Sequence, residues 1–361
     1  MKITIIAGAR PNFVKIAPLI KAINNSNKEK NRISYRLVHT GQHYDKKMSD
    51  NFFEELNIPF PDINLCCGGG TQAEQTAVIM VAFEKELSQR PCDLVIVVGD
   101  VTSTMACSIT AKKMNTKVAH IEAGIRSFDL TMPEEINRMV TDSLADYFFT
   151  TTQWATENLL HCGITEDRIF KVGNIMIDTL IDNMNRFKKP NIYDKISLLS
   201  GAYFVLTMHR PANVDEVEHL TLTLKEITNN VHNLPVIFPM HPRTASILSE
   251  HKIEAENLHI IEPLGYLEFN YLVKNAKAVI TDSGGITEET TVMRVPCLTL
   301  RNNTERPETC SMGTNVLVGT NPANIKPYID KVFSGQWAKG SVPELWDGHT
   351  AERIVNILLS M

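Results

Sequence analysis

Eight charged or histidine side chains directly follow short apolar segments that are typical of β-strands. They are Arg10, His39, Asp100, Glu122, His209, His241, Asp282 and Arg301. Ligands of open parallel sheets bind beyond the carboxyl ends of the strands, so these side chains are expected to lie beside a ligand. None of the spacings makes a Ser/His/Asp triad or a metal-binding set. The set instead combines cationic groups and helix starts, which suit a diphosphate, with carboxylates, which suit proton transfer.

The first of these positions belongs to the segment Gly8-Ala9-Arg10-Pro11, which Lys15 follows. The glycine fits a tight turn, and Pro11 fits the first turn of a helix. Arg10 and Lys15 are therefore placed to bind an anion near a helix start. Two solvated side chains near a helix end are an equally good interpretation of this segment alone. No G-x-G-x-x-G follows the strand, which argues against dinucleotide binding.

A sharper phosphate signal is the segment Asp282-Ser283-Gly284-Gly285, which follows an apolar strand and opens a helix. The backbone N–H groups of Ser283, Gly284 and Gly285 can approach a phosphate closely, and the helix dipole favours the anion. The helix contains Glu288 and Glu289, and a carboxylate one turn further on can accept hydrogen bonds from ribose hydroxyls. The competing interpretation is a capped helix with a glycine-rich turn. No G-x-x-x-x-G-K-[ST] occurs, so the site is not of the NTPase kind.

Three acidic residues are candidates for proton transfer. Asp100 follows a buried strand, although it could instead cap the helix that begins after it. Glu122 ends another strand. Glu134 lies in the first turn of a helix that begins at Pro133, and it is predicted to share a helix face with Arg138, four residues on. The neighbouring Glu135 is interpreted as an acid that is favoured by the helix dipole.

Three basic side chains of the second half complete the candidate set. His209 and His241 each end a predicted strand, and Arg306 lies in a charged loop after the last one. A single histidine is most often structural. Two histidines at equivalent strand ends make a shared ligand site a comparably good interpretation.

Apolar and amphipathic segments alternate along the chain, which predicts βαβ units and parallel sheets. Thr71-Gln72-Ala73-Glu74 fits a capping box that opens a helix toward Leu87. The pattern breaks near residues 170–200, which predicts an α/β protein with two Rossmann-like domains facing a central cleft. The predicted strands are 2–7, 35–40, 94–98, 118–122, 203–208, 236–240, 259–262, 278–281 and 297–300, and the first and last helices are 11–24 and 350–359.

Composition excludes several classes of protein. The 361 residues carry 36 Lys and Arg against 41 Asp and Glu, a net charge of −5, so no basic excess indicates nucleic-acid binding. The longest apolar runs are strand-sized, so we expect no membrane span, and Arg10 interrupts the first one too early for a signal peptide. The seven cysteines show no zinc-site spacing, and we expect a cytoplasmic protein with reduced thiols.

The sequence resembles the non-hydrolysing UDP-N-acetylglucosamine 2-epimerases along nearly its whole length. The matching segments are GARPNFVK (8–15), GDVTST (99–104), HIEAGIRS (120–127), MPEEINR (132–138), MHRPANVD (208–215), TDSGGITEE (281–289) and RNNTERPE (301–308). The resemblance implies the GT-B type fold, with domains at 1–170 and 171–347 and a last helix at 348–361 that packs back on the first domain. It also implies a UDP-sugar substrate, no cofactor and a homodimer.

The resemblance implies epimerisation at carbon 2 by elimination of UDP to a 2-acetamidoglucal and re-addition. Asp100, Glu122 and Glu134 then match the family's acid and base residues, and His209 offsets charge on the departing UDP. The implied substrate contacts are Arg10, Lys15, Arg138, Arg210, His241, Phe269, Ser283, Gly284, Gly285, Glu289 and Arg306. Glu289 is expected to hold the ribose, Arg306 the nucleotide end and Phe269 the uracil.

Departures from the family pattern leave the identity of the sugar in the UDP-sugar substrate undecided. Ala9, Asn12, Ala212 and Leu264 differ from common family residues, so a related substrate such as UDP-2,3-diacetamido-glucuronic acid remains an alternative. Activation by a second UDP-N-acetylglucosamine is not expected, because the segment 66–70 lacks an arginine. A glycosyltransferase of the same fold and a non-enzymatic nucleotide-sugar sensor are the more distant alternatives.

Overall fold

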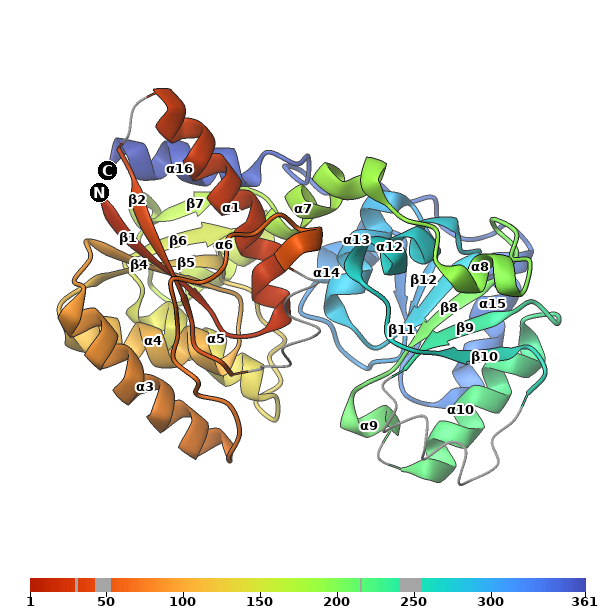
Figure 1. Cartoon of the computed structure of the whole chain (residues 1–361). Coiled ribbons are helices and arrows are strands. Elements are labelled where there is room, and N and C mark those ends of the chain that lie inside the picture. The colour runs from red at the N-terminus through yellow and green to blue at the C-terminus, as the bar shows by residue number, and fades with distance from the viewer. Residues whose placement is uncertain (30–31, 43–52, 215, 241–254) are drawn as a thin grey trace. The chain divides into compact units, whose positions relative to one another are not determined.

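The computed structural model describes residues 1–29, 32–42, 53–214, 216–240 and 255–361. The chain divides into two compact units, which are described separately (Figure 1). Unit 1 comprises Met1–Asn183 and Glu344–Met361, and unit 2 comprises Met184–Pro343. Both are α/β structures built on a parallel sheet, as the sequence predicts.

Unit 1 contains a seven-stranded parallel sheet in the order β3-β2-β1-β4-β5-β6-β7. Its central strand β4 is an unbroken apolar run with every residue buried, the pattern of a parallel strand covered on both faces. The strands are β1 (Lys2–Ala7), β2 (Ser34–His39), β3 (Ile63–Asn64), β4 (Leu94–Val98), β5 (Lys117–Ala123), β6 (Tyr147–Thr150) and β7 (Ile169–Lys171). The helices are α1 (Arg10–Glu29), α3 (Gln72–Gln89), α4 (Thr102–Lys113), α5 (Pro133–Leu144), α6 (Gln153–His161), α7 (Ile175–Asn183) and α16 (Thr350–Ser360).

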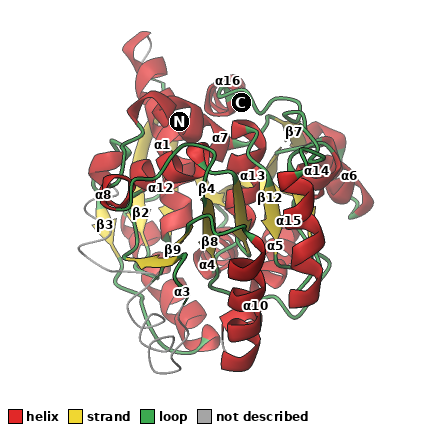
Figure 2. Cartoon of the chain, turned by 90° about the vertical axis from the view of Figure 1, so that its right-hand side faces the viewer, coloured by secondary structure: helices red, strands yellow, loops and turns green. Residues whose placement is uncertain are grey.

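Unit 2 contains a six-stranded parallel sheet in the order β10-β9-β8-β11-β12-β13. Its core lies between this sheet and the flanking helices, which Figure 2 distinguishes from the strands by colour. The strands are β8 (Phe204–Thr207), β9 (Val236–Pro239), β10 (Leu258–Ile261), β11 (Ala278–Thr281), β12 (Cys297–Thr299) and β13 (Asn315–Leu317). The helices are α8 (Asn191–Lys195), α9 (Pro211–Val214), α10 (Val217–Asn230), α12 (Tyr266–Asn275), α13 (Gly284–Met293), α14 (Pro307–Ser311) and α15 (Ile325–Phe333).

The boundary between the units falls at Asn183, later than the residue 170 predicted from the sequence. The reason is α7, which packs against α1 and α16 and so belongs to unit 1. The carboxylate of Asp178 on α7 accepts hydrogen bonds from the backbone N–H groups of Thr350 and Ala351, at 3.1 and 2.7 Å. These bonds satisfy two of the unpaired N–H groups at the start of α16.

The predicted capping box is present at the start of α3, where Thr71 and Glu74 each accept from the backbone N–H of the other. Nine predicted strands correspond to observed strands, with ends that agree within one residue. Among the residues that the structure describes, no helix combines the length and the apolar character needed to cross a membrane.

Candidate active site

The two acids Asp100 and Glu122 come from neighbouring strands of unit 1. β4 and β5 pair in parallel, so the turn after β4 and the end of β5 meet at one edge of the sheet. Gly99 makes the turn with a φ of 68°, a conformation that glycine adopts at little cost. Its N–H donates to the carbonyl of Ile121 at 3.0 Å, which ties the turn to β5 beside Glu122.

Glu122 lies at an irregularity of β5, which sets the direction of its side chain. The pairing of β5 with β6 shifts register between Ile121 and Ala123, and Glu122 has a φ of 68°. A bulge of this kind re-aims a side chain, and a left-handed glutamate stores strain of the sort found at functional sites. The Glu122 carboxylate is buried and pairs with the Lys15 ammonium of α1 at 2.6 Å. Lys15 therefore has a carboxylate partner within unit 1.

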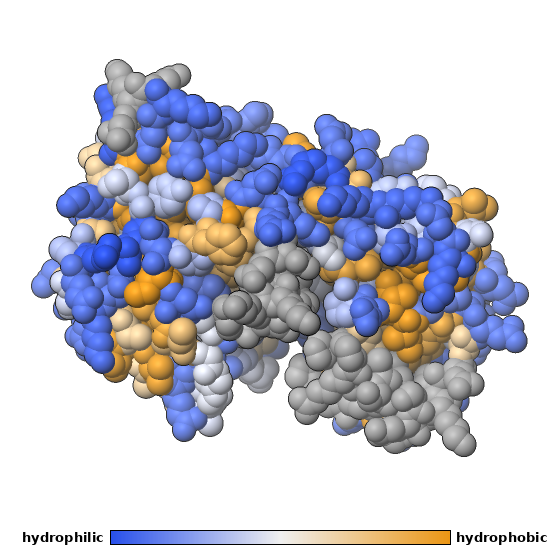
Figure 3. Space-filling model, in the orientation of Figure 1, coloured by the Kyte–Doolittle hydropathy of each residue, from blue (hydrophilic) through white to orange (hydrophobic). Residues whose placement is uncertain are grey.

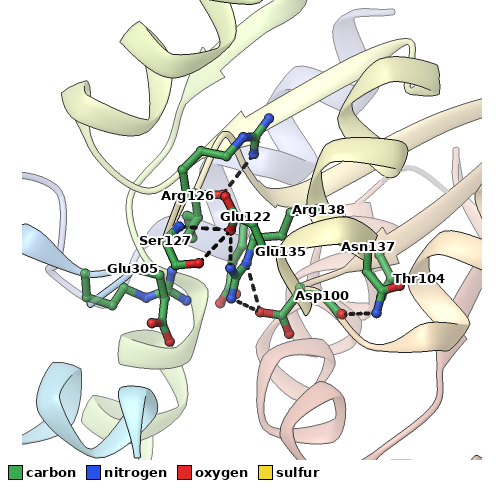
Figure 4. Close-up of polar contacts among 12 residues, drawn as sticks. Asp100, Thr104, Glu122, Arg126, Ser127, Glu135, Asn137, Arg138 and Glu305 are labelled. Carbon is green, nitrogen blue, oxygen red and sulfur yellow. Dashed lines mark hydrogen bonds and ion pairs between the residues drawn. The ribbon is translucent and has the colours of Figure 1, made fainter. Parts of the chain in front are cut away.

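Asp100, in the turn after β4, forms an ion pair with Arg138 of α5 (Figure 4). The guanidinium of Arg138 donates to the Asp100 carboxylate at 2.6 and 3.1 Å and to Glu135 at 2.7 Å. The Asp100 side chain does not cap α4, whose N-cap is Val101 and has no side-chain hydrogen bond. Two N–H groups of Arg138 thus hold Asp100 through one oxygen, Oδ2.

Glu134 and Arg138 lie four residues apart on α5, as predicted, but they differ in burial. Glu134 is exposed, whereas Arg138 and Glu135 are buried. Glu135 is the acid that pairs with Arg138, and it also accepts from the backbone N–H groups of Ser127 and Phe128 at 2.9 and 3.0 Å (Figure 4).

Two sets of buried polar groups at this edge are not predicted from the sequence. Asn12 accepts from the N–H groups of Gly8 and Ala9 at 3.0 Å and donates to Val98, so it fixes the turn before α1. Arg10 opens that helix, and its side chain lies outside the described part. The second set is His120 with Asp142, and the His120 ring contacts the carbonyl oxygen of Gly99 in the turn after β4.

In unit 2, Asp282 organises the segment that carries His209. Its buried carboxylate accepts from the backbone N–H groups of His209 and Arg210 at 3.0 and 2.9 Å, from Asn213 at 3.0 Å, and from His209 Nδ1 at 2.8 Å. Burial alone would raise the pKa of Asp282, but the His209 contact and these donors lower it to about 2. Asp282 is therefore an anion that orients the exposed imidazole of His209.

The predicted phosphate segment does precede a helix. Ser283 is the N-cap of α13, and it caps without a side-chain hydrogen bond. A Cβ at Gly284 would lie 2.5 Å from Glu305 Oε1, so a side chain at this position would displace the Glu305 carboxylate. The turn thus presents helix-start backbone groups, the arrangement suited to an anion.

Glu289 is buried on α13 and accepts a 2.9 Å hydrogen bond from the Tyr266 hydroxyl. Burial raises its pKa to about 7, with the bonds from Tyr266 and Asn270 opposing the rise. Arg306, the N-cap of α14, pairs with Glu288 in the core. Phe269 is half-buried on α12 against the core, and His241 lies outside the described residues.

Among the described residues, no cluster of three or more histidine, cysteine or acidic side chains is arranged to hold a metal ion. The candidate residues therefore form two groups, one in each unit. In unit 1, ion-paired carboxylates lie at the edge of the sheet where β4 and β5 end. In unit 2, His209 and the start of α13 lie at the edge where β8 and β11 end.

Comparison with known proteins assigns the chain to a family. A profile described as UDP-N-acetylglucosamine 2-epimerase matches residues 25–359. The UDP-N-acetylglucosamine 2-epimerase of Methanocaldococcus jannaschii is 41% identical over 99% of both chains. The UDP-2,3-diacetamido-2,3-dideoxy-D-glucuronate 2-epimerase of Pseudomonas aeruginosa is 40% identical over 88% of both.

The crystal structure of the M. jannaschii enzyme in complex with UDP-GlcNAc and UDP matches the whole chain with a TM-score of 0.89. The likeness extends over 100% of both chains at 41% identity, so it includes both units. With a family profile that spans nearly the entire chain and relatives of this identity, the chain belongs to the UDP-N-acetylglucosamine 2-epimerase family.

Proposed function

We propose that the protein interconverts UDP-N-acetylglucosamine and UDP-N-acetylmannosamine by inverting carbon 2 of the sugar. The observation that carries the proposal is the 41% identity, over full length, to an enzyme of that name whose structure holds UDP-GlcNAc and UDP. The ion-paired carboxylates at the β4–β5 edge supply the groups that such a reaction requires.

The chemistry explains why acids are needed. The proton on carbon 2 is not adjacent to a carbonyl and is not acidic by itself. Elimination removes that proton and expels UDP from carbon 1, which gives 2-acetamidoglucal. UDP then returns to carbon 1 while a proton is added to the opposite face of carbon 2. The two faces require two positioned acid–base groups, and water must be excluded so that the intermediate is not hydrolysed.

In unit 1, Asp100 and Glu122 are the proposed acid–base pair, with Glu134 as a third participant. Each of the first two is paired with a buried cation, Arg138 or Lys15, which fixes the position of its carboxylate. Their surroundings differ, since the Asp100 side chain is 28% exposed and that of Glu122 only 2%. Such a difference suits one acid to each face.

In unit 2, the helix start at Ser283, Gly284 and Gly285 is proposed to hold the diphosphate, with His209 to stabilise its charge as UDP departs. Glu289 is proposed to accept from the ribose hydroxyls. The remaining proposed contacts are Arg10, Lys15, Arg138, Arg210, His241, Phe269 and Arg306.

The direct test is proton exchange at carbon 2. Incubation of the purified protein with UDP-N-acetylglucosamine in deuterated water is expected to place deuterium at carbon 2 of both epimers, because the abstracted proton is replaced from solvent. Proton NMR and mass spectrometry of the recovered UDP-sugars measure the exchange. Glu122→Gln, purified in parallel, is the control for contaminating epimerase activity.

A second substrate has specific support, the 40% identity to the P. aeruginosa enzyme. The same experiment with UDP-2,3-diacetamido-2,3-dideoxy-D-glucuronate discriminates between them through the ratio of kcat/KM values. Exchange on neither sugar would contradict an epimerase function. Sugar transfer to an added acceptor without exchange would favour a glycosyltransferase.

We further propose a cytoplasmic homodimer whose product enters polysaccharide biosynthesis. Exposed apolar side chains on unit 1 support self-association, namely Val78 and Val81 on α3 and Ile136 and Met139 on α5. Apolar surface also lies among the hydrophilic residues in Figure 3. Sedimentation of the wild type and of Val78→Lys/Val81→Lys tests this, and a wild-type monomer would contradict it.

A further inference from the structure

His120 on β5 is fully buried and both of its ring nitrogens have partners. Nδ1 lies 2.7 Å from the Asp142 carboxylate of α5. Nε2 lies 2.8 Å from the carbonyl oxygen of Gly99, in the turn that leads to Asp100. The histidine therefore bridges a helix and the turn that carries a proposed acid–base residue.

The partner Asp142 is an anion. Besides His120, its carboxylate accepts from the Arg126 guanidinium at 2.6 Å and from the backbone N–H of Gly124 at 3.1 Å. The guanidinium is a permanent cation, and it favours the ionised form of this carboxylate together with the Gly124 N–H. A carboxylate so held has no proton to donate.

Both groups that face the imidazole are consequently acceptors. A backbone carbonyl cannot donate, and neither can an ionised carboxylate, so each ring nitrogen must carry a proton to make its bond. A neutral imidazole would leave one buried acceptor facing a lone pair, which is costly in the interior. The hydrogen-bond geometry thus requires the imidazolium form.

We propose that His120 is a positioning residue, held as an imidazolium, that sets the distance between the two acid–base carboxylates by clamping the Gly99 turn to β5. Gly99 uses both of its backbone polar atoms for this contact: its N–H donates to Ile121, and its carbonyl accepts from His120. His120 and Ile121 immediately precede Glu122 in the sequence. The inference rests on the proposed roles of Asp100 and Glu122.

The turn is also held from α5. The Asp100 carbonyl accepts from Asn137 of α5 at 2.8 Å, which fixes the other side of the same turn. Loss of the His120 bond would leave the Gly99 carbonyl unpaired in the interior and allow the peptide to rotate. Asp100 would then move relative to Glu122 although neither carboxylate had been altered.

Two substitutions separate the two bonds of the imidazole. In His120→Gln the amide nitrogen occupies the place of Nε2 and can still donate to Gly99. In His120→Asn it occupies the place of Nδ1 and can donate only to Asp142. We expect His120→Asn to lower kcat about 100-fold through misplacement of Asp100. We expect His120→Gln to lower kcat about tenfold or less. Both variants should keep the UDP dissociation constant within threefold of the wild-type value, a difference in binding free energy of about 0.7 kcal/mol.

A spectroscopic readout on the wild-type protein is independent of activity. With ¹⁵N-labelled histidine at pH 7.5, the spectrum should contain a histidine with protons on both ring nitrogens whose signal vanishes in His120→Gln. An unprotonated nitrogen on His120 would overturn the inference, as would equal kcat losses in the two variants. Full activity in Asp100→Asn would instead overturn the proposed role of Asp100, whatever the protonation of His120.

Discussion

Replacement of Glu122 by Gln, or of Asp100 by Asn, is expected to lower kcat roughly 10²–10⁴-fold, the range for loss of a positioned acid or base. Both changes keep the shape and the hydrogen-bonding oxygen of the side chain, so Lys15 and Arg138 retain an acceptor. Neither amide can take a proton from carbon 2. Steady-state rates for both directions of the reaction, with calorimetric titration of UDP, measure the effect.

UDP affinity should stay within several-fold of wild type in both variants, because the diphosphate is proposed to bind the helix start of α13 in unit 2. Glu86→Gln is a matched control in unit 1. Glu86 is a buried acid that pairs with Arg36 at 2.6 Å, so its loss should lower stability while kcat stays unchanged. Loss of UDP binding in both site variants would mean that these carboxylates hold the nucleotide and do not move protons.

The sequence predicts the sheets well because their strands are long apolar runs at regular spacing. β1, β4 and β11 coincide with the prediction, since each is buried on both faces and bounded by polar residues. The strands that were not predicted, β3, β6, β7 and β13, have two to four residues. Such segments are too short to show a period, and only their neighbours in the sheet define them.

The positions of Asp100 and Glu122 directly after strands identify them as candidate acids, but no pattern in the sequence identifies their partners. On α5 the sequence draws attention to Glu134, whereas the structure shows that Glu135 pairs with Arg138 and also accepts from the backbone N–H groups of Ser127 and Phe128. Likewise, His120 lies within a strand, where a histidine is most often a core residue. Its contact with Gly99 depends on the pairing of β4 with β5, which no local pattern records.

Replacement of Glu289 by Gln is expected to stabilise the ligand-free protein at pH 8 by up to about 3 kcal/mol and to change its stability little below pH 4.5. Burial raises the pKa of Glu289 from 4.5 to about 7. Below pH 4.5 the carboxyl is protonated in the folded and in the unfolded chain, so its ionisation favours neither. Between pH 4.5 and 7 the unfolded chain releases the proton first, and stability falls. Above pH 7 the penalty is constant.

Gln removes this penalty because it is neutral at every pH and keeps an oxygen for the Tyr266 hydroxyl. The same change should weaken UDP binding about tenfold, since a neutral amide accepts less strongly from the ribose hydroxyls than a carboxylate does. Urea unfolding between pH 4 and 8 measures the first effect, and calorimetric titration of UDP measures the second. Glu288→Gln is the matched control: it breaks the buried pair with Arg306 and should destabilise the protein at both ends of that range. A gain in stability for Glu289→Gln that did not depend on pH would mean that packing, and not the buried charge, limits this site. Together the two effects would show that Glu289 is retained for its ligand at a cost to the folded state.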